Sequence, residues 1–191
     1  MKDVFGILGV AFLLGSVIPY IIAIWNKSAK PHAFSWMLWS LINATVCAAQ
    51  VASDAGAGSW TAGITALLNA GIAGYALKYG ERNFTRGDWI VFLSALMALP
   101  LWVVTKDPLW SVILVSCIDV AGFYPTLRKS WNKPHQEVLM TFALGGVGFA
   151  FSVAALDSLS LTNWLYPGVV LTVDTVFIFT LLYRRRIEKA V

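Results

Sequence analysis

Two carboxylates fall inside long apolar stretches of this 191-residue chain, at Asp119 and Asp174. An ionisable group in such a stretch is costly to keep charged and is a functional candidate by default. Burial disfavours the charged form of a carboxylate, so either residue could hold a proton near neutral pH. Both are therefore candidates for proton coupling. The alternative is a neutral Asp that hydrogen-bonds to a neighbouring helix.

A stripe of aromatic and polar residues follows one face of the stretch 34–53. Its members recur every three or four positions: Trp36, Trp39, Asn43, Cys47 and Gln50. Residues with that spacing share one side of a helix. We expect the rings to stack a ligand and the amides to hydrogen-bond it, with ordinary packing as the alternative. The equivalent face between Leu139 and Val153 is apolar and small, so the expected ligand is amphiphilic.

Other chemistries lack residues with suitable spacing. Neither Cys47 and Cys117 nor His32 and His135 have metal-ligand spacing. No nucleophile elbow or phosphate-binding loop is present in the sequence. We therefore expect no enzymatic activity, no metal and no cofactor.

The elements that carry these residues are long apolar helices. Hydrophobic residues make up 58% of the chain and charged residues only 13%, about half the share usual in soluble domains. Stretches of about 18 apolar residues are long enough to cross a bilayer. We predict an all-α membrane protein with seven transmembrane helices, at 4–25, 34–53, 60–79, 88–105, 109–127, 137–156 and 162–183.

The basic residues alternate between the two sides of this arrangement. Twelve of the fourteen Lys and Arg residues fall on one side of the predicted membrane, and only Lys2 and Lys106 on the other. Since cytoplasmic loops are rich in Lys and Arg, we predict an N-terminus outside and a C-terminus in the cytoplasm. Contact with anionic lipid accounts for this charge, and no nucleic acid is implied. Short loops and the lack of paired cysteines favour a bacterial inner (plasma) membrane.

An internal repeat predicts the architecture. The pattern P-x5-W-N-K starts at Pro19 and again at Pro125, and a Pro-His pair follows each copy. Likewise, a Gly precedes Asn69 by six positions, and another precedes Asp174 by six. We predict a parallel 3+1+3 repeat: a first triple-helix bundle over 1–80, a linker helix over 81–107 and a second bundle over 108–191.

Two prolines of the repeat fall inside predicted helices. A proline in a helix interior removes a backbone hydrogen bond and disturbs the preceding turn. Pro19 and Pro125 occupy equivalent positions, so we expect a matched pair of hinges.

The segment from Val17 to Trp39 resembles the first PQ-loop of the SWEET and PQ-loop superfamily of membrane transporters. It has a proline at a helix end, then Lys27-Ser28, then a Ser before a helix that contains Trp. Tyr20 stands where the family has glutamine. The second copy, Pro125-Thr126, lacks the Ser-x-x-Trp continuation. The resemblance implies the same 3+1+3 fold and a central pocket faced by Asn69 and Asp174, with tryptophans nearby.

Two functions follow as expectations. The first is a small-solute transporter that works by alternating access, with Asn69, Asp174, Trp36, Trp39 and Asn43 as substrate-binding residues and Asp174 as the first candidate for proton coupling. The second is a membrane receptor or assembly protein on the same fold. The partners are a small-molecule substrate and the lipid bilayer, and a homo-oligomer is left open.

Overall fold

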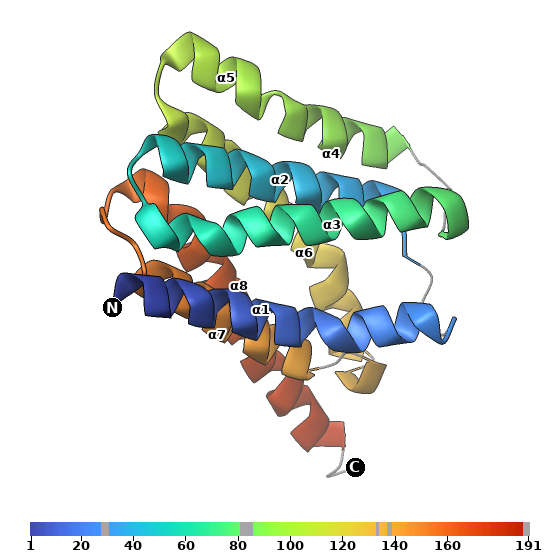
Figure 1. The fold of residues 1–191 in the computed structure, drawn as a ribbon. Helices are drawn as coiled ribbons and strands as arrows, with labels where there is room; N and C mark the ends of the chain where they lie inside the picture. The colour runs from blue at the N-terminus through green and yellow to red at the C-terminus, as the bar shows by residue number, and fades with distance from the viewer. Residues whose placement is uncertain (28–30, 81–85, 133, 137–138, 189–191) are drawn as a thin grey trace.

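Every regular element in the described part of the chain is a helix, and the helices pack side by side (Figure 1). The computed structural model describes residues 1–27, 31–80, 86–132, 134–136 and 139–188, without the side chains of residues 88, 124–126, 128–129, 132 and 136. The α-helices are Lys2–Trp25 (α1), Ala33–Ala52 (α2), Trp60–Tyr79 (α3), Arg86–Leu96 (α4), Ala98–Thr105 (α5), Pro108–Asn132 (α6), Leu139–Ala154 (α7) and Leu161–Glu188 (α8). Two short 3-10 helices, Gly56–Ser59 and Pro134–Gln136, precede α3 and α7.

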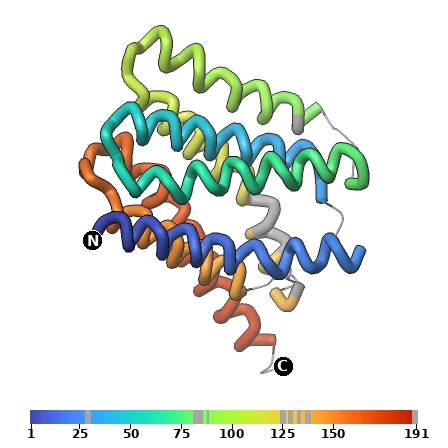
Figure 2. Tube along the Cα trace, in the orientation of Figure 1, coloured from blue at the N-terminus to red at the C-terminus, as the bar shows by residue number. Residues whose placement is uncertain are grey.

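Helices α4 and α5 replace the single helix expected over 88–105. They are separated by Met97 alone. Pro100 has no N–H group, so the Leu96 carbonyl four residues earlier loses its usual helical partner. The two pieces continue along one path, and the described chain thus forms seven helical rods (Figure 2). The expected all-α class and number of helices are confirmed.

The two halves of the chain pack their helices in the same order. In the first half, α3 contacts both α1 and α2, whereas α1 and α2 barely meet. In the second half, α8 contacts both α6 and α7 in the same way. The halves meet through α1 against α7 and through α2 against α6. These two interfaces correspond under the sequence repeat, because each joins a first helix to a second helix of the other half.

The contact between α1 and α7 is close because glycines face each other. A methyl group built on Gly148 would lie 3.0 Å from the carbonyl oxygen of Gly9. One built on Gly9 would lie 2.8 Å from the Thr61 hydroxyl. By contrast, Gly71 and Gly74 on α3 have no described neighbour within 4 Å, so helix packing does not explain them.

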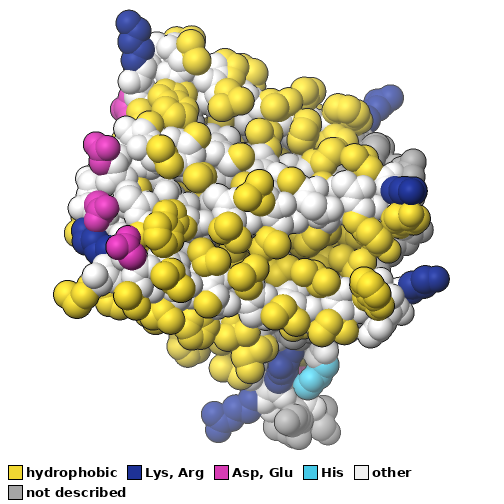
Figure 3. Space-filling model, in the orientation of Figure 1, with side chains coloured by type: hydrophobic (Ala, Val, Ile, Leu, Met, Phe, Trp, Pro, Cys, Tyr) yellow, Lys and Arg dark blue, Asp and Glu magenta, His cyan; other side chains and the backbone are white. Residues whose placement is uncertain are grey.

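The apolar character of the helices differs along the chain. Helices α1, α2 and α8 are long and apolar enough to cross a membrane. Shorter apolar helical segments cover Trp89–Thr105, Pro108–Phe123 and Leu139–Ala154. Apolar side chains also cover much of the face drawn in Figure 3, and several are largely exposed, including Val104 (79%), Leu67 (70%) and Phe179 (67%).

Candidate functional site

A cavity of about 590 Å³ lies where the two halves face each other. It is bordered by the C-terminal half of α1, the start of α2, the middle of α6 and the start of α7. Its described lining residues are Ser16, Val17, Pro19, Tyr20, Ala23, His32, Ser35, Trp36, Trp39, Asp119, Gly122, Phe123, Thr141 and Phe142. Its volume is in the range of small-molecule sites, about 300–1,000 Å³.

Three aromatic rings form one wall of this cavity. The ring centroid of Trp36 lies 5.0 Å from that of Tyr20 and 5.3 Å from that of Trp39. Trp36 and Trp39 are three residues apart on α2, which places them on the same face. Tyr20 reaches them from α1. The rings meet in tilted and edge-to-face geometry, which is favourable for aromatic pairs.

One carboxylate, Asp119 of α6, faces the cavity beside this wall. The Trp39 side chain donates a hydrogen bond to it. A carboxylate has roughly four acceptor positions. One indole N–H therefore leaves most of them available to a ligand. Among the described lining residues Asp119 is the only acid, and none is Lys or Arg.

Two further polar residues, Asn43 and Asp174, are buried and lie outside the described cavity lining. Asn43 is buried and donates from Nδ2 to the Trp39 carbonyl at 2.9 Å. Asp174 of α8 is also buried and lies close enough to Asp119 for the two charges to interact. Gly145 and Gly146 of α7 lie next to it, because a methyl group built on either would lie 3.5 Å from an Asp174 side-chain atom.

The predicted site residues fall into three groups. Trp36, Trp39, Asp119 and the expected hinge Pro19 line the cavity. Asn43 and Asp174 are buried and lie outside the described lining. Asn69 is buried on α3 and lies outside the lining. The side chain of Pro125, the other expected hinge, falls outside the described residues, although the residue lies within α6.

Several lining residues were not among the predicted site residues. Tyr20 and Phe123 contribute rings, and Ser35 and Thr141 contribute hydroxyls. Tyr20 had a signal in the sequence, since it follows Pro19 and occupies the glutamine position of the PQ-loop pattern. The contributions of Phe123 and Thr141 depend on how α6 and α7 are rotated towards the cavity, which the spacing within one helix does not fix.

The end of the molecule farthest from the cavity is closed by hydrogen bonds between the halves. Gln50 donates to the Asn163 carbonyl at 2.8 Å, and the Asn163 side chain donates to the Ser53 carbonyl at 2.9 Å. Ser152 donates to the Gly58 carbonyl at 2.7 Å. The described lining of the cavity lies instead towards the end where α1 finishes and α2 begins.

Charge also distinguishes the two ends. The closed end carries Asp3, Asp54, Asp107 and Asp157, and Figure 3 shows acidic side chains gathered there. The end with the cavity carries Lys27 after α1 and Arg184 to Arg186 near the end of α8. Lys2 is paired with Asp157 at 3.3 Å at the closed end.

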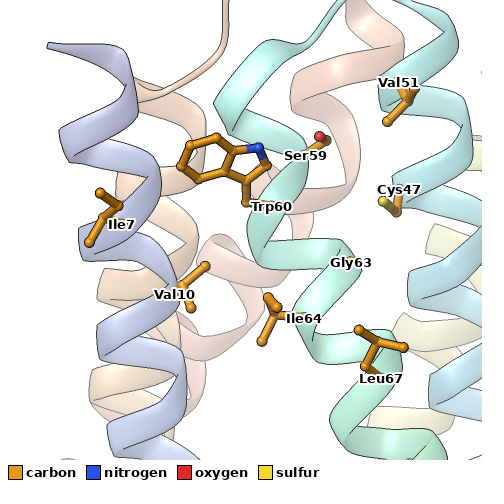
Figure 4. A pocket seen from close by; sticks show the side chains of 9 residues that line it. All are labelled: Ile7, Val10, Cys47, Val51, Ser59, Trp60, Gly63, Ile64 and Leu67. Atoms are coloured by element: carbon orange, nitrogen blue, oxygen red, sulfur yellow. The ribbon is translucent and has the colours of Figure 1, made fainter.

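A second hollow, of about 620 Å³, lies between α1, α2 and α3 (Figure 4). Its described lining is apolar apart from Ser59, Cys47 and the Trp60 indole, and it includes no charged residue. Ile7 and Leu67 on its rim are largely exposed. This hollow has the character of an outer groove, whereas the 590 Å³ cavity holds the residues capable of chemistry.

No protein-family model, curated protein or solved structure matches this chain.

Proposed function

We propose that this protein is an integral membrane transporter of small solutes and that the 590 Å³ cavity is its binding site. One observation carries the proposal: the cavity lies between two similarly packed halves, extends to one end of the bundle and is closed at the other. Alternating access requires a site that is reachable from one side at a time. Under this proposal, the structure represents the conformation of the transporter that is open to the cytoplasm.

Three features support the membrane part of the proposal. Helices α1, α2 and α8 can each cross a bilayer by length and composition. Large apolar side chains stand exposed on the outward faces, where a soluble protein would place polar ones. Basic residues gather at the cavity end, which the positive-inside rule assigns to the cytoplasm of a bacterial inner membrane.

The matching order of helices supports a 3+1+3 architecture. Each half has its third helix between the first and second, and the halves meet through equivalent helix pairs. Helices α4 and α5 then act as the linker that gives both halves the same orientation. In this architecture Asp119 and Asp174 stand near the axis between the halves. Their proximity makes them the proposed proton-coupling pair, since two close carboxylates do not both stay charged at low cost.

Obstruction of the cavity tests the proposal. Gly122 lines the cavity, and a methyl group built there meets no described atom within 4 Å. Gly122→Phe should therefore fill the cavity without a backbone clash. Gly71→Phe is the matched control, because Gly71 is equally open, helical and remote from the cavity.

The measurement is uptake into proteoliposomes from a mixture of sugars, amino acids, amines and vitamins, read by mass spectrometry. We expect the wild type and Gly71→Phe to accumulate the same solute and Gly122→Phe to lose at least about tenfold in rate. Uptake that is equal in all three proteins would reject the cavity as the route. If no solute enters with the wild type, the receptor or assembly function is favoured.

A further inference from the structure

We propose that the cavity selects monovalent organic cations with an apolar body, such as quaternary or substituted amines. This inference rests on the proposed function and names its substrate class. It starts from the charge of the described lining, where Asp119 faces the cavity and neither Lys nor Arg opposes it. A cation is the ligand that this negative charge attracts.

The aromatic wall is suited to the same ligand. The ring faces of Trp and Tyr attract cations within about 6 Å, and several rings together recognise quaternary ammonium groups. Tyr20, Trp36 and Trp39 form a continuous group of rings, and the hydrogen bond from Trp39 holds Asp119 beside it. A cation among these rings would therefore meet both π faces and a carboxylate.

The two serine hydroxyls of the described lining are already hydrogen-bonded within the protein. Ser16 already donates to the Leu13 carbonyl at 2.7 Å, and Ser35 lies 3.2 Å from His32 Nδ1 in a hydrogen bond. Both serine hydroxyls are thus already engaged, which makes them weaker partners for a polyhydroxylated ligand such as a sugar. Val17, Phe123 and Phe142 instead offer apolar surface to the body of an amphiphilic ligand.

A pair of isosteric probes separates charge from shape. Choline and 3,3-dimethylbutan-1-ol have the same shape, but only choline is charged. Calorimetric titration of the purified protein should show choline binding at least about tenfold more tightly than the alcohol, since only the charged probe gains from the ring faces and the carboxylate.

Variants at Asp119 and Trp36, with one control, test whether the cavity is responsible for the preference for choline. Asp119→Asn keeps an oxygen for the Trp39 N–H and removes the charge, so it should weaken choline binding roughly a hundredfold. Asp157→Asn is the matched control, because Asp157 is exposed and remote from the cavity, and it should leave choline affinity unchanged. Trp36→Leu should weaken choline binding about tenfold and change the affinity for the alcohol less.

The outcomes separate this inference from the proposed function. Equal affinity for the two probes, or choline affinity that survives Asp119→Asn, overturns the cation class. If Gly122→Phe still blocks uptake of a neutral solute in that case, the transporter proposal stands and only the substrate class is wrong. Absence of uptake of any solute, with choline binding that depends on Asp119, would instead support a cation receptor and overturn transport.

Discussion

At the scale of single residues, the facing glycines Gly9 and Gly148 determine how closely α1 and α7 approach each other. Their backbones nearly touch, so a side chain on either one has no space. Because backbone cannot move aside as a flexible side chain can, even one methyl group forces the helices apart.

Gly148→Ala should therefore destabilise the protein by about 1–3 kcal/mol, the usual cost of an overpacked contact. Thermal unfolding in detergent measures it, with Gly71→Ala as the control. That control should leave stability unchanged or raise it by about 0.5–1 kcal/mol, because Ala is the better helix former. An unaltered melting temperature for Gly148→Ala would mean that α1 and α7 are less close than described.

Asn163 is the central residue of the hydrogen bonds at the closed end. Its Nδ2 group donates to the carbonyls of Ser53 and Ser158, both at 2.9 Å, and its side chain is fully buried. Asn163→Ala leaves these part-buried carbonyls without their donor and opens a space in the packed end, so it should cost about 1–3 kcal/mol in the free energy of unfolding.

Thr172→Ala is the control for Asn163→Ala, since the Thr172 hydroxyl bonds only within its own exposed helix turn. Its effect on the same unfolding curve should stay within about 0.5 kcal/mol. A loss for Asn163→Ala no larger than that would show that the closed end is held by packing instead.

From the sequence, the position of a single side chain was predictable only relative to other residues of the same helix. The spacing of Trp36 and Trp39 placed them on one face, and the structure sets that face on the cavity. The repeat paired Asn69 with Asp174, yet neither lines the cavity. Which buried residue meets open space depends on the rotation of neighbouring helices, and no single helix encodes it.

At the scale of elements, proline has different consequences in two helices. Pro19 lies within α1, which continues unbroken to Trp25 and borders the cavity. Pro100 follows the break between α4 and α5, at the edge of the bundle (Figure 1). The sequence contained both prolines, but the expected single helix over 88–105 did not account for Pro100.

If Pro19 is a hinge, Pro19→Ala should slow solute uptake by proteoliposomes several-fold while raising stability, since the helix regains a backbone hydrogen bond. Pro100→Ala is its counterpart away from the cavity and should raise stability without changing uptake. Initial uptake rates and melting temperatures of both variants test whether Pro19 acts as a hinge. Equal rates for Pro19→Ala and the wild type would leave this proline without a role in opening.

At the scale of the whole molecule, the two ends differ in charge and in closure. The acidic end is closed by Gln50 and Asn163, and the basic end has the cavity. The sequence predicted the charge difference from its loops. It could not predict the difference in closure, because the repeat by itself implies two equivalent interfaces.

The orientation predicts where a reporter is active. A fluorescent protein fused after Val191 should fluoresce in a bacterial host, and alkaline phosphatase at the same site should stay inactive, because α8 ends at the basic end, which we propose faces the cytoplasm. Phosphatase fused before Met1, behind its own signal sequence, should be active. The reverse pattern would overturn the orientation and, with it, the side from which the cavity opens.

Thiol labelling tests that side directly. In a background with Cys47 and Cys117 replaced by Ser, Ser35→Cys should react with an impermeant maleimide in inside-out vesicles only, because Ser35 lines the cavity. Asp157→Cys at the exposed acidic end should react in right-side-out vesicles only. Labelling of Ser35→Cys from the outer side would contradict a conformation open to the cytoplasm.

The cavity takes different components from the two halves of the chain. Tyr20, Trp36 and Trp39 come from residues 1–80, whereas Asp119 and the nearby Asp174 come from residues 108–191. Two copies of the first half would give a lining without Asp119, and two copies of the second half would give a lining without Tyr20, Trp36 and Trp39. The halves have thus become complementary parts, and a chain cut in the linker should regain its site only when both fragments are produced together.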